Sequence, residues 1–136
     1  MVLLGFNSVI ERADVEAAQS RIRGHVRETP IIELDPESVA GPAFFKLEFL
    51  QHTGTFKARG AFNRMLAARA RGELDPAVGI VVASGGNAGM ANAFAAAHLG
   101  VPATVFVPET APAVKVAKLR EYGADRSEER RVGKEC

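Results

Sequence analysis

The sequence predicts an α/β fold in which helices flank a parallel β-sheet. One observation is the alternation of short, apolar, β-branched runs with helical periodicity between residues 79 and 123. A second is the spacing of these segments, which matches a βαβ unit with a right-handed crossover. The third is size, because 136 residues, 47% hydrophobic and 24% charged, suit one globular domain of modest length.

The first half of the chain predicts two helices with two strands between them. Segment 13–26 is amphipathic, and we expect Asp14 to be its N-cap and Val15 to lie on its apolar side. Segments 29–34 and 43–50 are predicted strands, separated by a turn-rich connector over 35–42. Apolar residues then recur at helical spacing, which predicts a helix over 56–70 that stops by Gly72.

The second half predicts strand, helix, strand and helix in that order. Segment 79–84 has the composition of a buried parallel strand, and 102–108 predicts a second one. Alanine-rich segment 87–100 predicts a helix ending at Gly100. Segment 110–123 predicts another, with Thr110 as N-cap and Gly123 as the stop.

Composition narrows the function classes. The net charge is +1, so nothing favours nucleic acid or an anionic membrane as a partner. We find no apolar run of membrane-spanning length and no secretory signal, and the only cysteine is Cys136. We therefore expect a cytoplasmic protein without disulfides. His25, His52 and His98 lack metal-ligand spacing, so we predict no metal site.

The last segment, "RSEERRVGKEC" over 126–136, has no apolar periodicity. It looks like the in-frame translation of a common sequencing-adapter oligonucleotide, and we predict that it is not native sequence. The alternative is a natural charged tail. On the first interpretation the chain is the front piece of a longer protein.

The turn "SGGNAG", Ser84 to Gly89, lies between a predicted strand and its helix. Glycines there let a ligand approach the backbone, and the free N–H groups at a helix start favour an anion. This predicts a site for a carboxylate or a phosphate. A tight turn that needs glycine only for steric reasons is an equally weighted alternative.

Lys57 lies at the centre of "HTGTFKARGAF", where a loop enters a predicted helix. An amine becomes a useful nucleophile or base when it is partly desolvated, which Phe56 and the apolar helix face could provide. Taken alone, a solvated surface lysine is the commoner case.

Together, "KLEFLQHTGTFKARGAF" and "ASGGNAGMANAFAAAHLGVPATVFVP" resemble the pyridoxal-phosphate enzymes of fold type II, which share the fold of the tryptophan synthase β subunit. Within these, the chain looks most like the serine/threonine dehydratases (ammonia-lyases). The resemblance covers nearly all of residues 14–125 and implies pyridoxal 5'-phosphate as the cofactor.

The resemblance also implies a role for each motif residue. Lys57 would form the Schiff base with the cofactor and act as the catalytic base, and Phe56 would pack near the cofactor ring. Asn87 would hydrogen-bond the phenolic oxygen of the cofactor. The turn residues that would hold the substrate carboxylate are Ser84, Gly85, Gly86 and Ala88.

The implied reaction converts L-serine or L-threonine into a 2-oxo acid and ammonia. Phe56, Ala58 and Ala88 differ from the residues usual in cysteine synthases, and Gly85 replaces the second serine that racemases place in the turn. The alternatives are a β-replacement or threonine-synthase-like enzyme of the same family, and a non-catalytic βαβ module that binds an anion.

The resemblance implies further parts that the chain does not include. The glycine-rich phosphate loop, the partner of the pyridine nitrogen and the cation-binding residues of the family lie beyond residue 136. We expect residues 1–57 to be the N-terminal part of the large cofactor domain and residues 58–125 to be an incomplete small βαβ domain. We also expect a small amino-acid substrate and a homo-oligomeric complete protein.

Overall fold

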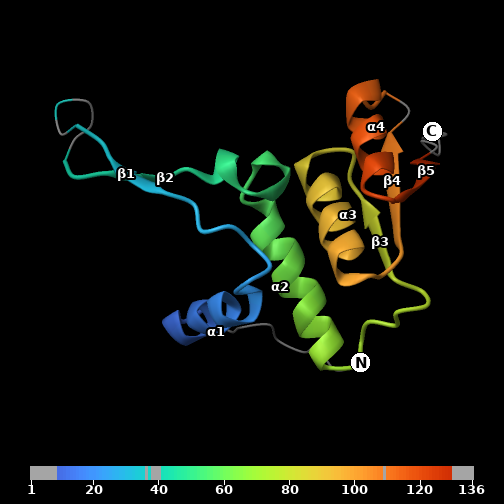
Figure 1. Ribbon diagram of the computed structural model, residues 1–136, viewed down its shortest axis with the longest axis horizontal. Helices are drawn as coiled ribbons and strands as arrows, with labels where there is room; N and C mark the ends of the chain where they lie inside the picture. The colour runs from blue at the N-terminus through green and yellow to red at the C-terminus, as the bar shows by residue number, and fades with distance from the viewer. Residues whose placement is uncertain (1–8, 36, 38–40, 109, 130–136) are drawn as a thin grey trace, which may run out of the picture.

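The computed structural model describes residues 9–35, 37, 41–108 and 110–129. The helices are α1 (Arg12–Ile22), α2 (Lys57–Ala70), α3 (Asn87–Leu99) and α4 (Ala113–Glu121), and the strands are β1 (Ile31–Glu33), β2 (Phe44–Lys46), β3 (Ile80–Ala83), β4 (Ala103–Pro108) and β5 (Asp125–Glu129). Two short 3-10 turns, η1 (Glu48–Leu50) and η2 (His52–Gly54), lead from β2 into α2. Figure 1 shows these elements in chain order.

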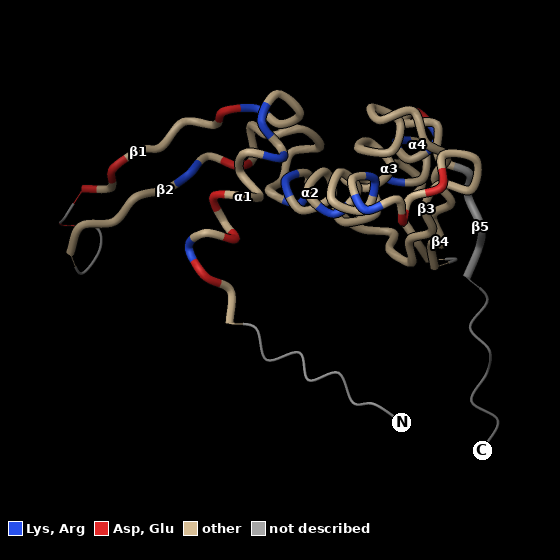
Figure 2. Tube along the Cα trace, turned by 90° about the horizontal axis from the view of Figure 1, so that it is seen from below, with Lys and Arg blue, Asp and Glu red and all other residues tan. Residues whose placement is uncertain are grey.

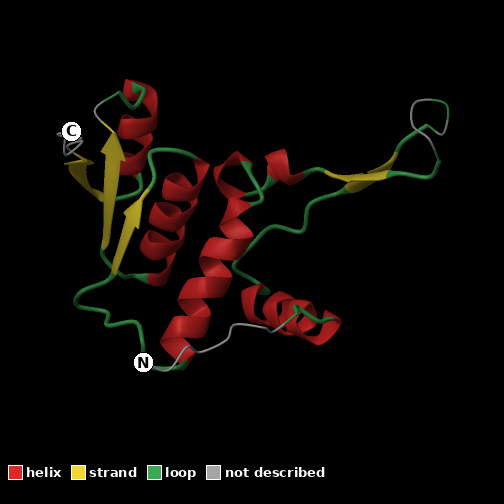
Figure 3. Ribbon diagram, turned by 180° about the vertical axis from the view of Figure 1, so that it is seen from behind, coloured by secondary structure: helices red, strands yellow, loops and turns green. Residues whose placement is uncertain are grey.

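The predicted βαβ unit is confirmed. Strands β3, β4 and β5 form a parallel sheet in that order, and Ile80 of β3 is paired with Ala103 of β4. Helix α3 connects β3 to β4 and contacts both strands, α4 and α2. Figure 3 shows α3 lying between the sheet and α2, so that it occupies the middle of the described structure.

The composition of α3 explains how it can occupy this position. Ala91, Ala93, Ala95 and Ala96 are all fully buried, although they do not lie on a single face of the helix. Small side chains let the sheet on one side and α2 on the other approach the α3 backbone closely. Phe62 and Met65 of α2 fill the adjoining space, and both are buried. The core therefore forms where α2 crosses α3.

Helix α1 begins earlier and ends earlier than predicted. Asp14 is not the N-cap; it lies in the first turn, where its Oδ2 accepts a hydrogen bond from the backbone N–H of Glu11 at 2.9 Å. Val15 is 59% exposed, so the predicted apolar side of this helix was wrong at its start. Ile22, at the end of the helix, is buried in the common core.

Strands β1 and β2 pair antiparallel and project from the rest of the chain as a narrow arm (Figure 1). The predicted strand over 43–50 was too long, because β2 ends at Lys46 and the chain then enters η1. The Leu47 N–H still donates to the Pro30 carbonyl at 2.9 Å, which closes the base of the arm. The apolar side chains on this arm are exposed, namely those of Ile31, Ile32, Phe44 and Phe45.

Three details of the second half differ from the predictions. Helix α4 begins at Ala113 after Pro112, so Thr110 is not its N-cap. Val81 is 68% exposed, so β3 is not buried on both faces within the described residues. Strand β5 was not predicted; it pairs with β4 from Asp125 onward and includes residues 126–129 of the suspected foreign segment. Residues 130–136 lie outside the described residues.

Backbone hydrogen bonding accounts for β5, because a strand can pair through its main chain with little demand on its side chains. Within the described ranges, no helix combines the length and apolar character that crossing a bilayer requires.

Candidate active site

Lys57 is the first residue of α2, and a sharp reversal of the backbone delivers it there. Thr53 has φ of 61° and Gly54 has φ of 72°, so two successive residues are left-handed. Glycine adopts this conformation readily, whereas a β-branched threonine does so rarely. Thr55 then accepts a hydrogen bond from the Lys57 N–H at 3.4 Å. The Thr-Gly-Thr sequence thus determines where α2 begins.

The Lys57 amine lies at the surface of the described structure. Its Nζ is 4.8 Å from the centre of the Phe56 ring, and it makes no hydrogen bond or ion pair with any described residue. Phe56 is itself 58% exposed. The expected desolvation of this amine by Phe56 and the helix face is therefore not found among the described residues.

The turn between β3 and α3 leaves one of its glycines open to a ligand. Ser84 Oγ accepts a hydrogen bond from the Gly86 N–H at 3.4 Å. A Cβ placed on Gly86 would meet only this Oγ, at 3.9 Å, so the space beside Gly86 is free of other described atoms. Gly86 has φ of −103°, an ordinary value, so its conformation does not require glycine. Asn87 begins α3 and is exposed.

Other glycines of the same turn are needed for packing. A Cβ on Gly89 would come within 1.8 Å of the Ser84 carbonyl oxygen and 3.4 Å of Val105. A Cβ on Gly85 would lie 3.1 Å from Pro108. Packing therefore accounts for Gly85 and Gly89, whereas it does not account for Gly86, which has open space beside it.

One cavity of about 270 Å³ joins the two motifs. Lys57 from the first motif and Ala88 from the second both line it, and its remaining walls are Gly60, Ala61, Arg64 and Asn92. The other predicted site residues, Phe56, Ser84, Gly85, Gly86 and Asn87, are not among the lining residues. The structure thus places Lys57 and the first turn of α3 on one cavity.

Sequence reasoning missed Arg64 and Asn92. Arg64 follows Lys57 by seven residues, about two helical turns, and Asn92 follows Ala88 by four. Each therefore lies on the same face of its helix as the predicted residue before it. Asn92 Nδ2 donates to the Ala88 carbonyl at 2.8 Å. Counting along the two helices from the predicted residues could have identified them.

The local electrostatics favour an anionic ligand. Helices α2 and α3 contact each other, and both begin at the upper end of the view in Figure 1. The positive ends of their dipoles therefore lie at the end of the structure that contains Lys57 and the Ser84–Gly89 turn. Helix α2 has basic residues and no acidic ones, and Figure 2 shows the basic residues along it.

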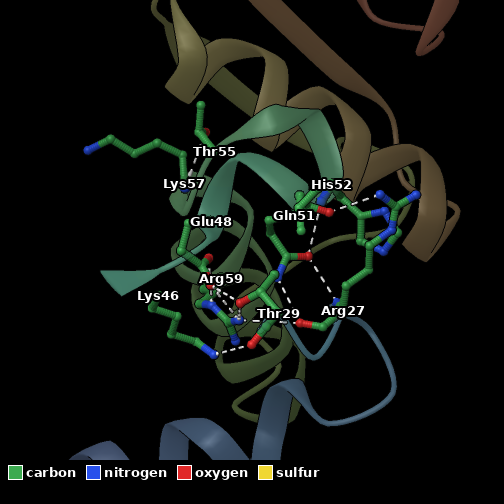
Figure 4. A network of polar contacts seen from close by, with 10 residues as sticks. Arg27, Thr29, Lys46, Glu48, Gln51, His52, Thr55, Lys57 and Arg59 are labelled. Carbon is green, nitrogen blue, oxygen red and sulfur yellow. Dashed lines mark hydrogen bonds and ion pairs between the residues drawn. The ribbon is translucent and has the colours of Figure 1, made fainter. Parts of the chain in front are cut away.

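A polar network on the other side of α2 was also missed (Figure 4). Arg59 donates to both carboxylate oxygens of Glu48, at 2.8 and 2.9 Å, and the Thr29 hydroxyl donates to Glu48 at 2.5 Å. The hydrogen bond from Arg59 is the main reason that the pKa of Glu48 lies below its ordinary value. A glutamate eleven residues before an arginine gives no periodic signal, so the sequence did not reveal this pair.

The three histidines come together in the fold, which the sequence analysis did not anticipate. His52 stacks on Phe94 with 4.7 Å between ring centres, and His98 meets His25 edge to face at 5.6 Å. Phe62 lies between, against both His25 and His98. Burial and the neighbouring Arg27 and His98 lower the pKa of His52.

Comparison with known proteins completes the description of this site. The family model described as pyridoxal-phosphate dependent enzyme matches residues 22–132. An L-threonine ammonia-lyase of Geobacter sulfurreducens is 44% identical over 113 residues, which are 82% of this chain and 27% of the relative. A phenylserine dehydratase of Ralstonia pickettii is 40% identical over 92% of this chain and 38% of its own length.

The fold is similar to that of solved enzymes. A serine racemase structure from Dictyostelium discoideum superposes with a TM-score of 0.76 at 36% identity, covering 85% of this chain and 38% of the racemase. The chain thus spans only about a third of the length of these proteins.

Proposed function

We infer the function from one premise: the chain belongs to the family of pyridoxal-phosphate dependent enzymes of fold type II. We propose that the complete protein is an ammonia-lyase (dehydratase) that converts L-serine or L-threonine into a 2-oxo acid and ammonia. The observation that carries this proposal is the cavity lined by both Lys57 and Ala88, because it brings an amine beside an anion-favouring helix start. Similarity to an L-threonine ammonia-lyase supports the choice of reaction.

The described residues fit pyridoxal phosphate. The Lys57 amine makes no hydrogen bond or ion pair within the described part of the chain, so it is accessible to a cofactor aldehyde. The open side of Gly86 admits a ligand to the backbone, and two helix starts favour anionic groups. When bound, the cofactor supplies an electron sink that makes the α-proton of an amino acid acidic.

Each residue of the site then has a defined task. With the cofactor bound, Lys57 Nζ would hold it covalently, and the same amine, once free, would take the α-proton of the substrate. Phe56 would pack against the cofactor ring, and Asn87 would hydrogen-bond its phenolic oxygen. The substrate carboxylate is bound by the turn residues Ser84, Gly85, Gly86 and Ala88. Loss of the β-hydroxyl and hydrolysis then yield the 2-oxo acid and ammonia.

A racemase is the second candidate, because a serine racemase structure has a similar fold. Racemisation by the route of that family uses a second serine in the turn, where this chain has Gly85. A Cβ at this position would lie 3.1 Å from Pro108 and 3.6 Å from Ala111, so the packing leaves little room for a serine. This crowding supports a lyase over a racemase.

We also propose that the domains are organised as in fold type II enzymes. Residues 1–57 belong to the large cofactor domain, residues 58–125 form part of the small domain, and residues 126–136 are not native. The exposed apolar arm of β1 and β2 supports an incomplete large domain, because such a surface is normally covered. The complete protein is a homo-oligomer.

The test uses the complete protein with bound pyridoxal phosphate and its Lys57→Ala variant. We expect borohydride to fix the cofactor to Lys57 in the wild type, as peptide mass spectrometry detects. We expect the variant to lack this adduct, the visible absorbance band and ammonia release from L-serine and L-threonine. A variant that keeps the covalent band would exclude Lys57 as the anchor. Keto-acid production replaced by D-amino acid would favour the racemase.

A further inference from the structure

The loop that holds Lys57 is fixed at both of its ends by polar side chains, one buried and the others partly buried. Before the loop, Gln51 is only 2% exposed. Its Oε1 accepts from the Arg27 N–H at 2.9 Å and its Nε2 donates to the Arg27 carbonyl at 2.9 Å. The same Oε1 accepts from the His52 N–H at 3.0 Å, at the start of η2. Both ends of the Gln51 amide are thus satisfied, which orients this residue uniquely.

Beyond the loop, Arg59 forms the second anchor. Its guanidinium binds both oxygens of Glu48, and the two side chains are 28% and 17% exposed. The same group also reaches the Arg27 carbonyl and the Thr29 hydroxyl, each at 3.3 Å. A planar guanidinium with several partners resists rotation more than a single hydrogen bond does.

The geometry of α2 connects this anchor to Lys57. Residues two apart on an α-helix point about 200° away from each other around its axis. Because Arg59 is held toward the Glu48 side, Lys57 must point toward the opposite side. Figure 4 shows the Lys57 side chain leaving the helix away from the network that contains Arg59 and Glu48.

The strained loop between the anchors strengthens this connection. Thr53 is left-handed, with φ of 61°. A β-branched residue keeps such a conformation only when its surroundings enforce it. Gln51 immediately before η2 and Arg59 just inside α2 provide that enforcement, since each binds the segment around Arg27.

We infer that Glu48, Arg59 and Gln51 are positioning residues for Lys57. They fix the entry into α2 so that the Lys57 amine faces the cavity it shares with Ala88, and they touch neither substrate nor cofactor. The inference rests on the proposed function, because it assigns the network a task in the chemistry of Lys57.

The chain offers a matched control pair just beyond the C-terminal end of α2. Arg71, directly after α2, binds Glu73 through two hydrogen bonds of 2.7 and 2.8 Å, but both side chains are about half exposed. Arg59→Lys and Arg71→Lys each keep the positive charge and lose a bidentate contact with a glutamate. The two substitutions lie at opposite ends of α2. Glu48→Gln tests the partner of Arg59 and retains its size.

The experiment uses the complete protein with bound pyridoxal 5'-phosphate. It measures the fraction of cofactor that borohydride fixes to Lys57, the pH midpoint of the visible band, and kcat and KM. All are measured well below the unfolding temperature. We expect Arg59→Lys and Glu48→Gln to shift the band midpoint by about half a pH unit or more. We expect kcat to fall roughly 10- to 100-fold with a smaller change in KM, as displacement of a reacting group does. Arg71→Lys should match the wild type.

The outcomes separate failure of the proposed function from failure of the positioning role. A wild type with no cofactor fixed to Lys57 rejects the proposed function itself. A wild type with that adduct, and variants of Arg59 and Glu48 with unchanged midpoint and kcat, overturns the positioning role alone, even if their thermal stability falls. If Arg59→Lys does not fold, Gln51→Glu, which keeps the acceptor and removes the donor, is judged by the same readouts.

Discussion

The carbonyl oxygen of Ser84 lies 1.8 Å from the point that a Cβ atom on Gly89 would occupy. The first turn of α3 is therefore seated directly on the end of β3, closer than any other residue would allow. This contact fixes the turn through which the proposed substrate carboxylate is bound. Gly86, three residues earlier, has no such contact: the nearest atom to a Cβ placed on it is Ser84 Oγ, at 3.9 Å.

This contrast predicts opposite effects for two glycine substitutions. Gly89→Ala should destabilise the protein by about 3 kcal/mol, because backbone atoms on both sides cannot move apart cheaply. Gly86→Ala should leave stability nearly unchanged, since its φ of −103° suits alanine, but it should raise KM by crowding the ligand. Thermal unfolding and steady-state kinetics measure the two effects. Equal loss of stability in both would contradict the division of roles.

The left-handed Thr53 gives a prediction about strain. Its Oγ1 is buried without a hydrogen-bond partner among the described residues. Thr53→Gly removes this hydroxyl and the strain at φ of 61°, which together outweigh the added freedom of the unfolded chain. We expect a gain of about 1 kcal/mol in unfolding free energy, measured by denaturant titration. A loss of stability would show that Thr53 packs more favourably than its backbone indicates.

The histidine cluster gives a prediction about pH. The pKa of His52 lies below its ordinary value of 6.5, first because the ring is partly buried and then because Arg27 and His98 repel its charge. Protons therefore bind the unfolded state more readily. The stability contributed by His52 is fully present above pH 6.5 and is lost as the pH falls below that value.

The check is thermal unfolding of the wild type and His52→Phe between pH 5 and pH 8. Phenylalanine keeps an aromatic ring on Phe94 but has no proton to bind. The variant should lose less stability on acidification across pH 6.5 than the wild type does. Parallel curves for the two proteins would show that other groups cause the acid sensitivity.

The 136-residue chain expressed alone should aggregate and should not release ammonia from L-serine or L-threonine. Its arm and sheet expose large apolar side chains, among them Phe44 at 62% and Val81 at 68%. Light scattering and an ammonia assay with added pyridoxal phosphate test this. Turnover well above that of the free cofactor would show that the chain itself contains a working site.

A related pair of truncations tests the C-terminal segment. Deleting residues 130–136 should leave the solubility of the chain unchanged. Deleting residues 126–136 also removes most of β5 and leaves β4 with an unpaired edge, so it should lower solubility even if the segment is foreign.

The sequence by itself determined the order of the four helices and of strands β1 to β4, and the two motifs. Periodicity predicted α2 and α3 to within a residue or two, because each is long enough to show a helical repeat between clear stops. The motif pair around Lys57 and Asn87 was sufficient to identify the family. Each of these features depends on residues that are close together in the sequence, so the residue pattern alone is enough to predict it.

Only the tertiary structure decided which residues meet. No periodicity links Glu48 to Arg59 or His25 to His98, since each pair is joined by a chain reversal rather than by a helix repeat. The end of β2 at Lys46 and the pairing of β5 likewise depend on backbone partners from elsewhere in the chain. The assignment of Gly89 to packing and of Gly86 to open space required the position of the Ser84 carbonyl, which the fold alone supplies.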